Sequence, residues 1–76
     1  MKRDDIIDLH SQRRINAVRI MPAPTTQKHW TLFFEESEGR SHFVINEEGD
    51  VSVYQTIDAA VAELEDMGFN WAEIRF

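Results

Sequence analysis

The stretch from residue 56 to residue 69 constrains the fold most, because it reads as a complete helix with both ends marked. Thr56 is a suitable N-cap, since its hydroxyl can accept a hydrogen bond from an N–H group that the first turn leaves unpaired. Gly68 stands where a left-handed residue ends a helix, and Phe69 after it can fold back on Leu64 in a Schellman-type contact. Apolar residues at helical spacing predict one buried stripe, made of Ile57, Ala60, Val61, Leu64 and Met67.

Strand patterns lie on both sides of this helix. Residues 51–54 alternate as a strand before it, and residues 71–76 alternate as a strand after it. Upstream, residues 30–35 and 41–46 read as two strands joined by a polar, glycine-containing turn, which is typical of a hairpin. A second tight turn at residues 46–50 leads into residues 51–54, so we expect these three strands to form an antiparallel meander.

The first third of the chain carries weaker patterns. Residues 15–21 predict an earlier strand, which ends at Pro22 because proline lacks the N–H group that a sheet ladder needs. Residues 22–29 are then a surface loop, and residues 3–12 fit a short helix with a narrow apolar face and no good cap. The expected fold is α+β in the order (α)-β-β-β-β-α-β. Its sheet is mostly antiparallel, has four to five strands, and is covered on one face by the C-terminal helix.

The length of 76 residues predicts one domain over residues 1–76 with one hydrophobic core. A core of this size supplies only about 3–5 kcal/mol, so association with a second chain is a common source of further stability. The absence of cysteine excludes disulfides and thiol catalysis and suits a cytoplasmic location. No secretion signal or membrane span is expected, because the apolar runs are too short.

Charge is divided unevenly along the chain, whose formal net charge is −6. Residues 1–30 hold six Lys or Arg against three Asp, a balance of +3, whereas residues 31–76 hold two Arg against eleven Asp or Glu, a balance of −9. Such an excess of acid repels a phosphate backbone, so nucleic-acid binding is disfavoured. The acids of the last helix predict either a solvated outer face or a docking face for a basic protein, a pattern that a DNA mimic would share. These acids are Asp58, Glu63, Glu65 and Asp66.

No motif typical of catalysis or metal binding is present. His10, His29 and His42 are far apart, and none has the short spacing to another ligand that zinc sites show. Ser41 and His42 are neighbours on a predicted strand and therefore point to opposite faces, so they do not form a nucleophile and base. Residues 46–50 lack the alternating ligand positions of a calcium loop. We therefore expect a non-enzyme that uses no cofactor and no metal.

Two classes of function remain. The first is a small bacterial protein that acts as a protein-interaction module or a homodimer, because one helix cannot cover both faces of a sheet that carries apolar residues on each. Alternation packs Trp30, Leu32 and Phe34 under the helix and leaves Phe33, together with Val44, as candidate contacts on the other face.

The second class is a nucleic-acid-associated regulator that uses the basic first half of the chain. Aromatic residues beside arginines on a sheet are one way in which proteins hold single strands. The candidate contacts for this function are Arg13, Arg14, Arg19 and Lys28.

Overall fold

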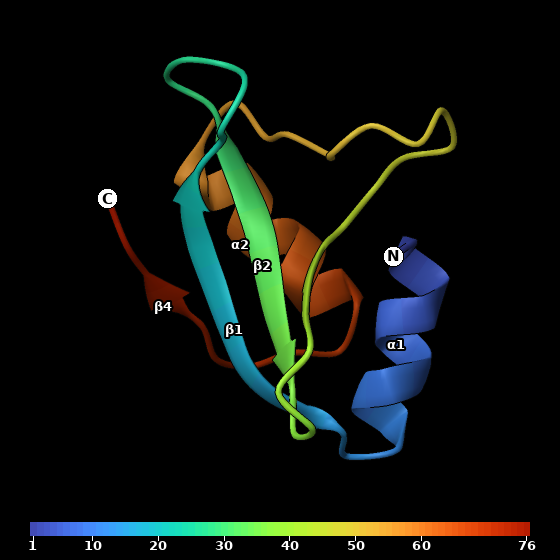
Figure 1. Ribbon diagram of the computed structural model, residues 1–76. Helices are drawn as coiled ribbons and strands as arrows, with labels where there is room; N and C mark the ends of the chain where they lie inside the picture. The colour runs from blue at the N-terminus through green and yellow to red at the C-terminus, as the bar shows by residue number, and fades with distance from the viewer.

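The computed structural model describes residues 1–76 and has an α+β fold, as predicted. Its elements follow the order α1 (Arg3–Ser11), β1 (Ile15–Pro22), β2 (Trp30–Glu36), β3 (Ser41–Phe43), α2 (Ile57–Asp66) and β4 (Glu73–Ile74). The four strands form one mixed sheet in the order β3-β2-β1-β4. In Figure 1, α2 lies behind β1 and β2, and no helix lies in front of them.

The β1–β2 hairpin supplies the sheet side of the core. Val18 stands opposite Phe34, and Ile20 stands opposite Leu32, so these four side chains share one face. All four are buried under the helices, while Trp30 packs at the margin of the core. The prediction that alternation turns Leu32 and Phe34 inward is therefore confirmed.

The predicted meander is wrong in its last strand, because residues 51–54 do not form a ladder. β3 ends at Phe43, after which Val44 turns into the core. The chain then stays beside β2 through isolated contacts, including a bridge between Trp30 and Tyr54. Residues 51–54, predicted as a strand, therefore form an irregular segment that lies beside one end of β2.

β4 makes the sheet mixed, which corrects the prediction of a mostly antiparallel one. It pairs in parallel with β1, with Arg19 opposite Glu73 and Ile20 opposite Ile74. The parallel direction arises because α2 carries the chain back to the end of the sheet where β1 begins (Figure 1). The predicted strand over residues 71–76 shortens to two residues, extended by one hydrogen bond of 2.9 Å from the Arg75 N–H to the Ile20 carbonyl.

Both predicted ends of α2 are confirmed. The Thr56 hydroxyl accepts a hydrogen bond of 3.0 Å from the Ala59 N–H. Gly68 has a φ of +100°, and the Phe69 N–H donates to the Leu64 carbonyl at 2.9 Å, as a Schellman motif requires. These local contacts define where α2 stops and aim the following segment back at the sheet.

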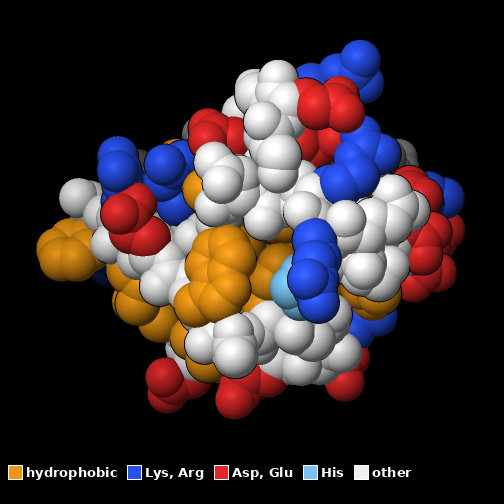
Figure 2. Space-filling view, turned by 90° about the horizontal axis from the view of Figure 1, so that it is seen from below, with side chains coloured by type: hydrophobic (Ala, Val, Ile, Leu, Met, Phe, Trp, Pro, Cys, Tyr) orange, Lys and Arg blue, Asp and Glu red, His pale blue; other side chains and the backbone are white.

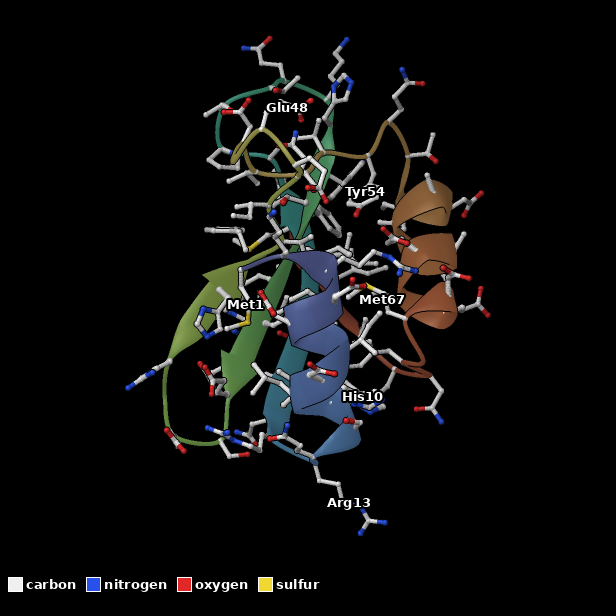
Figure 3. The ribbon with its side chains drawn as sticks, turned by 90° about the vertical axis from the view of Figure 1, so that its right-hand side faces the viewer. Met1, His10, Arg13, Glu48, Tyr54 and Met67 are labelled. Carbon is white, nitrogen blue, oxygen red and sulfur yellow. The ribbon has the colours of Figure 1, made fainter.

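The predicted N-terminal helix forms as α1 and shares the covering of the sheet with α2. Ile6 of α1 is completely buried in the core, so the prediction that the C-terminal helix alone covers this face is wrong. As expected, Lys2 at the N-cap makes no side-chain capping bond. The side view in Figure 3 shows α1 beside α2, and His10 of α1 contacts Gly68, the residue that follows Met67.

Val61 is the exception within the predicted buried stripe of α2. Ala60, Leu64 and Met67 are buried and Ile57 is half-buried, whereas Val61 is 38% exposed. A stripe this wide reaches beyond the sheet, because β4 is too short to cover it. Val61 therefore faces an open space between α2 and β4.

Candidate protein-interaction site

An open groove of about 500 Å³ lies between α2 and the segment that follows it, and we call it the α2–β4 groove. Seven of its ten lining residues are hydrophobic, a larger share than in the depression beside the start of α1 or in the one beside β1. The lining includes the buried Ile20 and Leu64 together with the exposed Val61, Trp71 and Ile74. The groove thus reaches core residues at this edge of the sheet, and its exposed walls are Val61, Trp71 and Ile74.

Exposed apolar side chains gather at the same edge. Four of the five large hydrophobic side chains that the protein exposes, Val61, Trp71, Ile74 and Phe76, lie on α2 or on the C-terminal segment, and only Val53 lies elsewhere. Figure 2, which views the molecule from below, shows hydrophobic side chains open to solvent over this part of the surface. Apolar exposure that is gathered in this way marks an interaction surface, whereas scattered exposed residues do not.

The segment after α2 is held by an aromatic stack. Phe69 is buried and stacks on His10, with ring centroids 4.0 Å apart, and Trp71 packs edge-on against Phe69 at 6.1 Å. His10 Nε2 donates to the Gly68 carbonyl at 3.0 Å, since a carbonyl oxygen can only accept. The groove wall at Trp71 is therefore anchored from α1 as well as from α2.

The acids predicted as a docking face are not equivalent in the structure. Asp58, Glu65 and Asp66 are exposed, but Glu63 turns toward α1, where it accepts from Arg3 Nε at 3.2 Å. Arg3 also pairs with Asp66. Glu63 therefore belongs to the contact between the two helices, and the unpaired acids of α2 are Asp58 and Glu65.

Tyr54, the only tyrosine, also joins the contact between α1 and α2 at Glu63. The Tyr54 hydroxyl donates to Glu63 at 3.3 Å. Burial, together with the negative charge of Glu63, raises the pKa of Tyr54 to about 12, so the hydroxyl stays protonated. This group serves to tie residue 54 to α2.

Glu65 occupies a position that helix stability does not favour. It lies in the last turn of α2, where the unpaired carbonyl groups carry a partial negative charge. That turn contains no basic residue, and no cation stands within ion-pair distance of Glu65. Glu65 also lines the α2–β4 groove, so it adds negative charge to an apolar depression.

The sheet face away from the helices presents Phe33 beside Phe43, and the predicted pairing of Phe33 with Val44 on this face is wrong. Phe33 stands directly opposite Phe43, and directly opposed residues share a face, so the next residue, Val44, points into the core. The two rings meet edge-on with centroids 5.4 Å apart. Arg19 lies over the Phe33 ring, 5.6 Å from its centroid, and donates to Glu73 at 2.9 Å.

The four predicted nucleic-acid contacts do not gather on one surface. Arg13 follows α1 and projects away from the molecule (Figure 3), whereas Lys28 lies in the loop beyond the far end of β1. Arg14 donates to Glu38 at 2.9 Å, and Arg19 is held on the open sheet face. Two of the four cations are thus already paired with carboxylates, and the other two lie at opposite ends of β1.

A buried carboxylate lies at the base of the β2–β3 hairpin. Glu36 accepts a hydrogen bond of 2.5 Å from His42 Nε2 and another of 3.4 Å from Arg14. The bond from His42, helped by the positive charge of Arg14, lowers the pKa of Glu36 despite its burial. Ser41 lies on the opposite side of the strand, as predicted, and is exposed. The cluster contains no nucleophile and holds the hairpin ends together.

The remaining motifs have local structural roles. In the turn at residues 46–50, the Asn46 side-chain oxygen accepts from the Glu48 and Asp50 N–H groups, each at 3.0 Å. No three His, Asp or Glu side chains form a group that could hold a metal ion. Neither helix has the length and apolar character needed to cross a membrane.

Sequence reasoning did not name Trp71, Ile74 or Phe76 as contacts. One signal was available. In a strand over residues 71–76, alternation places Trp71 on one face and Ile74 and Phe76 on the other, and a strand with one covered face cannot bury the large apolar side chains of both faces. That signal does not reveal that the strand lies at an edge of the sheet.

No model of a known protein family, no curated protein and no solved structure matches this chain. Function is therefore inferred from the α2–β4 groove, the open sheet face and their charges.

Proposed function

We propose that this chain is a non-catalytic protein-interaction module whose docking surface is the α2–β4 groove. The observation that carries the proposal is the gathering of four of the five exposed large apolar side chains at this one edge. Leaving such a surface in water costs free energy, and a protein partner that covers it removes the cost. The groove is anchored by the Phe69 stack, so little ordering of its wall opposes binding.

The exposed acids of α2 adjoin this surface. Asp58 and Glu65 have no ion-pair partner, and Glu65 reaches the groove. Charges at the rim of an interface act mainly on selectivity and on the rate of encounter. These acids favour partners that bring basic side chains to the outer side of α2.

The proposal is tested by comparing what the intact protein and two groove variants capture from a lysate of the source organism. Trp71→Ser and Ile74→Ser remove apolar side chains from the groove, while Val53→Ser removes an equally exposed one from a different surface. We expect a defined protein to be retained by the wild type and by Val53→Ser, and to fall about tenfold or more with either groove variant.

Circular dichroism and urea unfolding establish that each variant is folded before capture. Proteins that bind all four forms equally are background. A complete absence of groove-dependent capture contradicts the proposal.

A second candidate, single-strand nucleic-acid binding, is favoured by one observation. Phe33 and Phe43 lie side by side on the open face with Arg19, an arrangement that can stack on bases. Fluorescence anisotropy with single-stranded RNA and DNA at low salt tests it, with Phe33→Leu and Phe43→Leu expected to weaken any binding. No binding at low salt removes this candidate.

A further inference from the structure

β4 leaves its outer edge unpaired, since it is the last strand in the sheet order. The Arg75 N–H donates to the Ile20 carbonyl of β1, and backbone groups alternate in direction along a strand. The backbone groups of Glu73 and Arg75 therefore face β1, and those of Ala72 and Ile74 face outward. An exposed edge of this kind is a template for another strand.

We propose that a second copy of this chain adds its β4 to this edge, antiparallel, about a two-fold axis at Ile74. The inference rests on the proposed function, because it makes a second copy the occupant of the α2–β4 groove. An isologous contact of this type requires a surface that complements itself. Both the charges and the apolar side chains of residues 72–76 meet that requirement.

The charges select this register. With Ile74 on the axis, Glu73 stands opposite Arg75 of the second copy, and Arg75 stands opposite Glu73 of the second copy. Both side chains point to the open sheet face, where Glu73 already accepts from Arg19 and from Arg75. A register centred on Glu73 would instead place Glu73 of one copy opposite Glu73 of the other, and one centred on Arg75 would do the same with Arg75, so both oppose like charges.

The apolar side chains fit the same register. Ile74 is directly opposite Ile20 in the ladder, so it lies on the helix-facing side, where it lines the groove. Phe76 follows on the same side by alternation and is 99% exposed. In the dimer, Phe76 of the second copy stands opposite Ala72, a small groove residue that leaves room for the ring.

Long-range repulsion does not prevent this contact. Each copy has a formal net charge of −6, but at physiological salt the screening length is about 8 Å, so separated acidic surfaces are largely screened. Asp58 and Asp66 do not line the groove. The dimer therefore leaves both side chains exposed on the outer side of α2.

Sedimentation equilibrium of the full chain tests the inference. We expect the wild type to rise with concentration from its 8.9 kDa mass to twice that value. Glu73→Arg and Arg75→Glu each oppose like charges across the axis, so each variant alone should dimerise about tenfold or more weakly. Mixed in equal amounts, the two variants should form a heterodimer, because the all-basic edge of one then meets the all-acidic edge of the other.

Phe76→Ser tests the dimer without altering the ion pair of Arg19 with Glu73 or the packing of the single chain. The Phe76 ring is almost completely exposed in the single chain, so its removal leaves the fold intact but should weaken the dimer about tenfold or more. Val53→Ser is the matched control and should leave the dimer unchanged. Amide hydrogen exchange at Ile74 should slow as the dimer forms.

Two results would overturn the inference. One is a protein that stays monomeric at every concentration. The other is a dimer whose affinity is unchanged by Phe76→Ser and which forms no more readily between the two charge variants than within either of them. Groove-dependent capture of a different protein would still uphold the proposed function in either case. The two proposals therefore fail separately.

Discussion

Replacing Glu65 by glutamine should stabilise the protein, although the substitution adds no contact. Glu65 is exposed, has no ion-pair partner and lies in the last turn of α2, which contains no basic residue. Its charge opposes the negative end of the helix dipole, and glutamine keeps the size and helix propensity of the side chain while removing that charge. Asp58→Asn is the matched control, since Asp58 lies in the first turn, where a carboxylate is favourable.

The expected magnitude follows from the position of each charge. An exposed charge in a terminal helix turn contributes about 0.3–1 kcal/mol, so Glu65→Gln should raise the free energy of unfolding by that amount and Asp58→Asn should lower it similarly. For a domain of this size, 1 kcal/mol corresponds to a shift in Tm of about 4–8 °C. Both changes should shrink when salt is added, because salt screens charges at the surface.

Urea unfolding followed by tryptophan fluorescence, at low and at high salt, measures both variants. The reasoning is supported if the two variants change the free energy of unfolding in opposite directions at low salt and if both changes approach zero at high salt. Glu65 is then a charge that destabilises the folded protein. A loss of stability in Glu65→Gln at low salt, or equal effects in the two variants, would refute the reasoning.

Three further outcomes are expected. Phe34→Ala should cost about 3–5 kcal/mol in urea unfolding, because Phe34 is completely buried, and a cost below about 1 kcal/mol would contradict the core described above. Glu36 has a pKa lowered by His42, so its stabilising contribution is present above the pKa of the unfolded chain and is lost as pH falls through the folded value. Glu36→Gln should flatten the acid side of a plot of urea midpoint against pH, and an unchanged slope would exclude this role. Tyr54 should titrate at about 12 in phenolate absorbance, above its ordinary value of 10, and its contribution to stability should disappear as pH rises through that range. Glu63→Gln should move this titration to lower pH, and an unmoved titration would show that the carboxylate does not act on Tyr54.

Local signals predicted the elements of this fold well. The cap at Thr56 and the stop at Gly68 involve contacts within a few residues, so they could be read from the chain directly. The strands at residues 15–21 and 30–35 followed from alternation, the predicted hairpin of residues 30–35 with 41–46 forms as β2 and a shorter β3, and the helix at residues 3–12 also forms. Each of these features depends on neighbours in the sequence.

The candidate site could be predicted only in part. Phe33 was expected on the uncovered sheet face and lies there, but its neighbour is Phe43, because ladder register decides which side chains share a face. Glu63 was expected on the outer side of α2, yet Arg3 draws it into the contact between helices. A pattern of acids along a helix does not show which of them meets a cation from elsewhere in the chain.

The amino-acid sequence by itself determined where the chain turns, where α2 begins and ends, and which side chains are apolar, because those properties arise from short-range backbone and side-chain chemistry. Only the tertiary structure decided that β4 lies parallel to β1 at an edge and that Val61 faces an open groove. The physical reason is that exposure depends on which distant segments cover a residue, and the two-residue β4 leaves Val61 and the groove beside it uncovered.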